Sequence, residues 1–387
     1  MKTTKCSGLT VRVVLAVSIL MVLSGDALCY PPDNAAVLYY KACLVIGDPP
    51  DEIAEVMNDA IKGKITADEK LQEFVKGQSN AIKTTMAATA IPDCDWGMDY
   101  SEGFDLLMPH LGPMRKVCKV ILLDAQIKAG QGHVEKAIEQ SLACFKIARH
   151  IKKDTTIISS LVGISVEQLA CETIGSILSK HAVNEKLLIV VRDNLNEMTS
   201  DYGTMKECMR MEADIAASYV RMENMPAVFE ALGIKDDEKI AEFDEEMLAK
   251  SIAYYRKHME KLIKAFDLPY EKAIVKIRSI QKKMEEDVEK NKEAVLSSVI
   301  APAMEKCLNN EIAALNRINA LRCAVEIYLQ KQKAGKLPDK LPSGVAKDNF
   351  SNKNFIYEKK DTGFILRCQG KDLIKDEIHE YEFKAAK

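Results

Sequence analysis

Aromatic residues and glycine are scarce in this sequence. It contains one tryptophan, aromatic residues make up 6% of the chain, and 18 of the 387 residues are glycine. Strand-rich proteins draw on aromatic and β-branched residues and on glycine turns, so this composition disfavours an all-β fold. Alanine, leucine, glutamate and lysine are plentiful, and these residues favour helices. With 47% hydrophobic and 29% charged residues, the chain has the composition of a globular protein rather than a disordered one.

The sequence also lacks a strong net charge and the common catalytic motifs. Its formal charge is −3, which provides no basic face for a nucleic acid. It contains no GxSxG, HExxH, Walker or GxGxxG pattern. We therefore expect no nucleic-acid partner, no cofactor and no metal centre, and an enzyme is not our first expectation.

Long apolar runs are confined to the amino terminus. The run from Val13 to Leu23 follows Lys2, Lys5 and Arg12, and small residues come after it. This is the layout of a secretory signal peptide. The run is shorter than the roughly 20 residues that a transmembrane helix needs. The sequence predicts a signal peptide over 1–29, cleaved between 27 and 29, and no later membrane-spanning segment.

The mature protein is therefore expected to be exported, to the periplasm or the cell exterior. Attachment of a lipid at Cys29 is an alternative, but the leucine that usually lies three residues upstream of a lipidated cysteine is missing. We do not expect a lipid anchor.

Cysteines are scattered singly. If Cys6 and Cys29 leave with the signal peptide, nine of the eleven cysteines remain, with no CxxC pair among them. An oxidising compartment favours paired cysteines, yet many of these replace alanine on predicted helices and read as small core residues. One or two disulfides remain open from the sequence alone.

Apolar residues at helical spacing predict stacked antiparallel helical hairpins over 30–230. One predicted helix spans 67–89 and begins at a capping box on Thr66. The hairpin around Gly130-Gln131-Gly132 places small residues at Ala137 and Cys144 and resembles one tetratricopeptide unit. No regular 34-residue repeat accompanies it, so the fold expected is mainly α rather than a repeat array.

The rest of the chain divides into two regions. Residues 231–334 are dense in lysine and glutamate and predict long helices with solvated faces. A coiled coil is the alternative, but Leu268-Pro269 interrupts its spacing. Residues 335–387 alternate apolar and polar positions on both sides of Asp361-Thr362-Gly363, which predicts a β-hairpin in a small carboxyl-terminal cap.

Two stretches carry a resemblance. The first joins Asp33-Asn34-Ala35-Ala36 to Asp95-Trp96-Gly97 and Pro109-His110-Leu111, and the second runs from Arg317 through Leu337-Pro338-Asp339 to Gly370. Together they resemble uncharacterised exported helical proteins typical of planctomycete-like bacteria. The tail also resembles the carboxyl-terminal module of type II secretion pseudopilins. Neither resemblance implies an activity, and the helix before the tail is amphipathic, unlike the membrane helix of a pseudopilin.

The loop over 91–112 gathers most of the residue types that carry chemistry. The candidate ligand-binding residues are acids, two aromatic residues and one imidazole: Asp95, Trp96, Asp99, Tyr100, Glu102 and His110. Carboxylates bind hard cations or act as acid and base in glycoside cleavage, and an exposed tryptophan stacks on sugar rings. The alternative is structural, with Trp96 anchoring the loop and the acids capping turns. A calcium-hand register fails because Phe104 falls where a carboxylate is needed.

Two functions follow from these expectations. The first is a non-enzymatic helical scaffold that binds a protein or a cell-envelope component. The second is a carbohydrate-active hydrolase, or a metal- or glycan-binding protein, that uses the 91–112 loop. An exposed Trp96 beside converging acids would favour the second. A further alternative is docking by strand addition to the tail, for which a free strand edge would be the sign.

Overall fold

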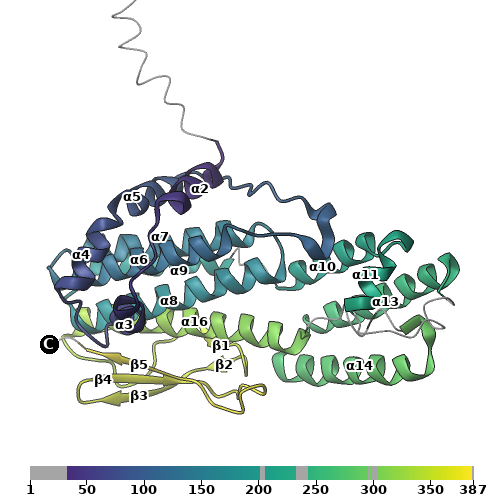
Figure 1. The fold of residues 1–387 in the computed structure, drawn as a ribbon. Coiled ribbons are helices and arrows are strands. Elements are labelled where there is room, and N and C mark those ends of the chain that lie inside the picture. Colours follow the sequence, from purple (N-terminus) through teal and green to yellow (C-terminus); the bar gives the residue numbers. More distant parts are fainter. Residues whose placement is uncertain (1–32, 201–204, 232–242, 295–296, 298–302, 386–387) are drawn as a thin grey trace, which may run out of the picture.

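The structure is a computed structural model that describes residues 33–200, 205–231, 243–294, 297 and 303–385. The expected signal peptide lies outside these residues. The described chain is mainly helical, with a small antiparallel sheet at its carboxyl end, as the sequence predicted (Figure 1).

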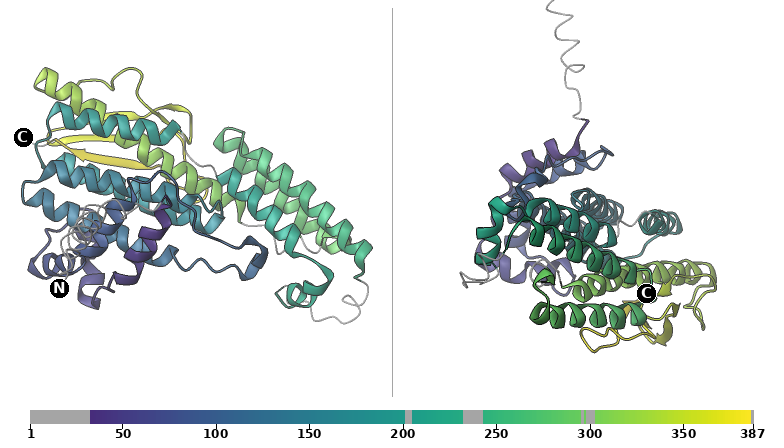
Figure 2. Two further views of the ribbon diagram at one scale, coloured as in Figure 1. Left: turned by 90° about the horizontal axis from the view of Figure 1, so that it is seen from above. Right: turned by 90° about the vertical axis from the view of Figure 1, so that its right-hand side faces the viewer.

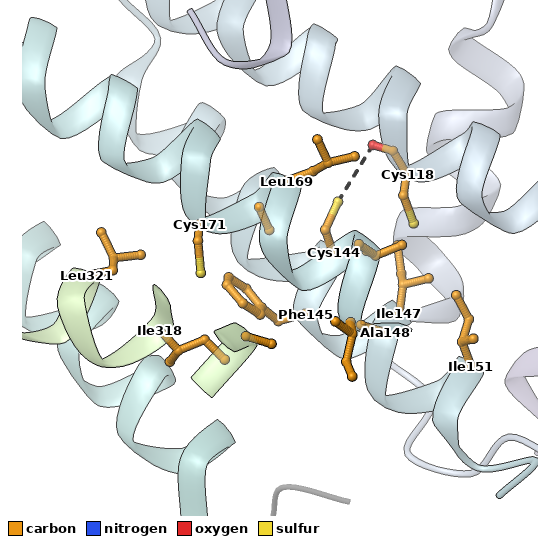
Figure 3. Packing of buried hydrophobic residues seen from close by; sticks show 14 of the residues in the cluster. Cys118, Cys144, Phe145, Ile147, Ala148, Ile151, Leu169, Cys171, Ile318 and Leu321 are labelled. Atoms are coloured by element: carbon orange, nitrogen blue, oxygen red, sulfur yellow. Dashed lines mark hydrogen bonds between the residues drawn. The ribbon is translucent and has the colours of Figure 1, made fainter. Parts of the chain in front are cut away.

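Three long helices form the centre of the helical body: α6 (Leu111–Gly130), α7 (Val134–Lys152) and α8 (Ile157–Lys180). The predicted hairpin is formed by α6 and α7, which pack closely because Ala137 and Cys144 are fully buried between them. The Cys144 thiol lies 3.9 Å from the carbonyl oxygen of Cys118 (Figure 3). The resemblance of this pair to a tetratricopeptide unit stays a prediction.

Helix α8 is predominantly apolar, with Glu167 and Glu172 among its few charged residues. By length and composition it would suffice to cross a membrane, which our sequence analysis did not foresee. Most of it is buried within the protein, against α6, α7 and the later helix α16 (Met304–Ala334). Burial on every side explains why it lacks a polar face. Figure 3 shows Leu169 and Cys171 of α8 beside Phe145 of α7 and Ile318 of α16.

The first four helices cover α6. They are α2 (Ala35–Val45), α3 (Asp51–Ile61), α4 (Glu69–Gly77) and α5 (Ser79–Ala88). The prediction of one helix over 67–89 was wrong, because the chain breaks at Gln78 between α4 and α5. The predicted cap on Thr66 was wrong too: Asp68 caps α4 by accepting a hydrogen bond from the Leu71 amide at 2.9 Å.

Among the described residues, five helices lie between α8 and α16. They are α9 (Glu185–Ser200), α10 (Met205–Tyr219), the short α11 (Met225–Ala231), α13 (Glu245–Ala265) and, after the Leu268-Pro269 turn, α14 (Tyr270–Lys290). Helices α10, α13 and α14 project from one end of the body (Figure 2). Three short 3₁₀ helices lie at Tyr100–Asp105, Met222–Asn224 and Lys292–Ala294.

The carboxyl-terminal region forms two small sheets. Strands β1 (Lys347–Asp348) and β2 (Lys353–Asn354) pair antiparallel, and β3 (Ile356–Lys360), β4 (Gly363–Arg367) and β5 (Glu380–Lys384) form a sheet in that order. The predicted hairpin is β3–β4, whose register pairs Lys360 with Gly363. The apolar face of this sheet lies against α8 and α16 (Figure 1).

Helix α16 passes between these parts and contacts most of them. It packs on α8, α9, α14, β1 and β5, so it lacks a distinct solvent face. Its buried polar side chains are satisfied by other elements: Asn309 donates to Asp372 at 3.1 Å and Asn316 donates to Asp348 at 3.0 Å. Both aspartates belong to the tail and are fully buried, Asp348 at the end of β1 and Asp372 in the segment between β4 and β5.

A buried charged cluster joins four helices at the base of the projecting lobe. Lys152 of α7 lies 2.6 Å from Glu167 of α8, and Glu311 of α16 accepts a hydrogen bond from the Met205 amide, at the start of α10, at 2.6 Å. Lys152 crosses α8 at Gly163, where a Cβ atom would lie 2.7 Å from the Lys152 Cγ. Burial raises the pKa of Glu311 to about 7, opposed by the Met205 amide and Lys152, while Glu167 and Glu207 add to the increase.

We expect this carboxyl group to make stability depend on pH. Since the pKa of Glu311 is about 7 in the folded chain and its ordinary value is 4.5, the folded state holds this proton more tightly, and stability falls as pH rises through that window. Glu311→Gln keeps an acceptor for Met205 but cannot ionise. The variant should match the parent near pH 4 and exceed its free energy of unfolding by about 1–3 kcal/mol above pH 7. Urea unfolding across pH measures this, and parallel curves would contradict it.

Candidate functional site

The 91–112 loop is anchored by Trp96. This side chain is 4% exposed, and its indole nitrogen donates to the main-chain oxygen of His150 at 2.8 Å. The indole stacks on His110 at 4.2 Å and on Tyr39 at 5.5 Å between ring centroids. Tyr40 meets it edge-on. No open ring face is left for a sugar to stack on.

The acids of the loop hold its turns. Asp95 accepts a hydrogen bond from the Gly97 amide at 2.9 Å, and Asp99 accepts from the Ser101 amide at 3.0 Å and from its hydroxyl at 2.6 Å. Both aspartates and Glu102 are exposed. Contacts of this kind are the usual turn-forming bonds of aspartate.

The other two candidate residues point into the protein. Tyr100 donates to the main-chain oxygen of Asp154 at 2.7 Å. His110 is 1% exposed, and its Nε2 lies 2.8 Å from the Asp154 carboxylate. The exposed acids therefore do not converge with His110 on an open site. The alternative of glycan binding or glycoside cleavage required an exposed Trp96 beside converging acids, and the structure shows the structural anchor instead.

Trp96→Phe tests the anchor. The phenyl ring keeps apolar packing but loses the buried hydrogen bond to His150, whose carbonyl keeps the weaker bond from the Lys153 amide at 3.2 Å. We expect a loss of about 1–3 kcal/mol in the free energy of unfolding, measured by circular dichroism in urea. Lys353→Gln, on an exposed strand, is the control. Because Trp96 is the one tryptophan, its fluorescence reports the loop directly, and ready quenching by acrylamide in the folded chain would contradict the anchor.

A second cluster of possible metal ligands lies in the tail. Asp372, Glu377 and His379 bring ligand atoms close together. The two Asp372 oxygens already accept hydrogen bonds from Asn309, His379 and the amides of Ile374 and Lys375. Through these hydrogen bonds the buried Asp372 holds its loop against α16. We assign no metal to this cluster.

The cysteines are core residues. In the described part of the chain all nine are free thiols, and every one except Cys43 is buried. Burial raises the pKa of Cys94 and Cys323 to about 12. Since the thiolate is the reactive form, these thiols oxidise slowly even in an oxidising compartment.

A candidate site is a cleft beside the tail. It is lined by the loop after α3, the middle and end of α8, the centre of α16 and strand β5, and has a volume of about 470 Å³. This volume lies within the range of small-molecule sites, roughly 300–1,000 Å³. Gly63, with φ at +67°, turns the loop toward α8 at a point where a Cβ would collide with Ser176.

More cations than carboxylates line the cleft. The cations are Lys62, Lys64, Lys180, Arg317 and Lys384, and the carboxylates are Glu172, Glu380 and Glu382. Arg317 bonds Glu172, and Lys62 lies 3.4 Å from the other oxygen of that carboxylate. The guanidinium also lies over the Tyr381 ring, 5.9 Å from its centroid.

Two of these cations lack an acidic partner. Lys180 donates to the main-chain oxygen of Gly63, and among the described residues no carboxylate lies within ion-pair distance of Lys180 or Lys384. Burial lowers the pKa of Lys180, and the neighbouring Lys384 lowers it further. Both lysines line the cleft, and their positive charges disfavour each other there.

Buried polar atoms also face this region without a good partner. The Ser176 hydroxyl is buried and makes no hydrogen bond. The Tyr381 hydroxyl is buried with the Cys368 sulfur, a weak acceptor, beside it. Buried polar groups are normally hydrogen-bonded, so each of these hydroxyls has the capacity for a further hydrogen bond.

The cleft has no signature in the sequence. Its residues come from four segments between Lys62 and Lys384, and no local spacing joins them. No known protein family, curated protein or solved structure matches the chain.

Proposed function

We propose that this chain is an exported helical binding protein, without catalytic activity, whose cleft between α8, α16 and β5 takes an anionic ligand. The observation that carries the proposal is the pair Lys180 and Lys384, two neighbouring cations with no carboxylate partner in the described structure. An anion between them would remove their repulsion and form charge-assisted hydrogen bonds.

The rest of the cleft suits recognition rather than chemistry. Arg317 and Lys62 hold Glu172, so this carboxylate is engaged in ion pairs and not poised as a base. The cysteine in the wall, Cys171, is a buried thiol whose pKa burial raises well above its usual range. A nucleophile needs the opposite shift. The Ser176 hydroxyl supplies a neutral polar contact beside the lysines.

Export and a cell-envelope partner belong to the same proposal. Export is supported by the basic and apolar residues at 2–23, and the buried, poorly ionised thiols are compatible with an oxidising compartment.

Binding of two probe anions, succinate and inorganic phosphate, tests the site by titration calorimetry at low salt. We expect one of them to bind, and the double variant Lys180→Gln/Lys384→Gln to weaken that binding at least tenfold, since each lysine contributes a charge-assisted contact. Binding should also weaken with added salt.

Lys353→Gln, which removes an exposed lysine of β2 away from the cleft, is the matched control and should bind like the parent. The proposal is overturned if neither anion binds, or if the control loses as much affinity as the double variant.

A further inference from the structure

Strand β5 has a free edge along the cleft. The sheet order is β3-β4-β5, so β4 covers only one of its edges. The Cys368 amide donates to His379 and the Ala385 amide donates to Thr362. In an antiparallel pair, alternate residues direct their main-chain groups to the partner strand. Residues 379, 381, 383 and 385 therefore face β4, and 380, 382 and 384 face away from it.

The end of this edge is closed by side chains. The Lys384 amide donates to the Ser179 hydroxyl at 3.1 Å, and its carbonyl accepts from the Tyr328 hydroxyl at 2.7 Å. These two bonds confirm the direction that the register gives. They also show that, at Lys384, polar side chains of α8 and α16 bond the main-chain groups on this edge.

Two residues earlier, the edge faces the cleft. In the described part of the chain, no side chain bonds the main-chain N–H or C=O of Glu382. The wall opposite consists of small residues of α8, Gly175 and Ser176, which also line the cleft. Gly175 lies close enough to the strand that an added Cβ would be 3.4 Å from the Phe383 ring. The cleft is thus bounded by a strand edge on one side and a smooth helix surface on the other.

We propose that the ligand is the carboxyl-terminal end of an extended peptide, which pairs with the main chain of Glu382 while its terminal carboxylate lies between Lys180 and Lys384. This inference rests on the proposed anion-binding function and adds the chemical class of the ligand. Strand addition to an edge supplies main-chain hydrogen bonds whatever the peptide sequence, and a cleft of about 470 Å³ holds a short segment rather than a folded domain.

Equilibrium dialysis of the chain against two pools of N-acetylated tripeptides tests the inference. The peptides of one pool end in a free carboxylate, and those of the other end in an amide. We expect the acids to be retained at least tenfold more than the amides, and to bind at least tenfold more tightly than succinate, which has the charge but no peptide groups.

Two substitutions at one position separate strand pairing from charge. Glu382→Pro removes the outward N–H, and because this N–H takes no part in the β4–β5 ladder, proline is tolerated there as on other edge strands. It should reduce tripeptide binding to the level of succinate. Glu382→Gln keeps the N–H and should bind tripeptide acids at least as well as the parent. Circular dichroism verifies that both variants fold.

The outcomes distinguish the two proposals. If tripeptide acids bind no better than succinate and Glu382→Pro has no effect, the peptide inference is overturned and the anion site stands. If neither the acids nor succinate and phosphate bind, the proposed function fails with it.

Discussion

Helix α16 must bury almost all of its surface although it carries amides, carboxylates and guanidinium groups along its length. Its polar side chains are satisfied because each bonds to a different neighbour. Asn309 bonds to Asp372, Glu311 to the Met205 amide at the start of α10, and Asn316 to Asp348. Arg317 bonds to Glu172 of α8, and Arg322 bonds to Asn196 of α9. A buried polar group left without a partner costs about 1–3 kcal/mol, so each of these bonds fixes where a neighbour can lie. The helix thus sets the positions of the lobe, the helical body and the tail.

The cleft is a consequence of this arrangement. Asp348 is fully buried and accepts hydrogen bonds from Asn316 and from the amides of Phe350, Gln369 and Gly370, which ties two segments of the tail to one helix. Fixed in this way, the sheet presents β5 beside α8, and Arg317 lies between Glu172 and the Tyr381 ring. The free strand edge and the repelling lysines then share one concave space.

The sequence predicted those features of the fold that depend on residues close together in the chain. The helical class, the 130–132 turn and the β-hairpin around Asp361 all follow from spacing and turn chemistry, and all are present. The break at Gln78 was missed because the helical pattern runs through it, and α8 was not recognised as apolar enough to span a membrane. Of the six candidate residues in the 91–112 loop, Trp96, Tyr100 and His110 contact the helical body, whereas Asp95, Asp99 and Glu102 are exposed; their role as ligand-binding residues stays a prediction. The cleft could not be predicted, because its lysines, Arg317 and β5 meet only through long-range packing.

Native-state hydrogen exchange in the parent and in Asn316→Ala tests most directly whether α16 fixes the tail. Asn316 donates to Asp348 and accepts from the Asn349 amide at 2.5 Å. The account predicts that the ladder amides of Tyr381 and Phe383 in β5 lose about 1–3 kcal/mol of protection, while α6 and α7 keep theirs. Protection of β5 unchanged by the substitution, or lost equally in α6 and α7, would contradict it.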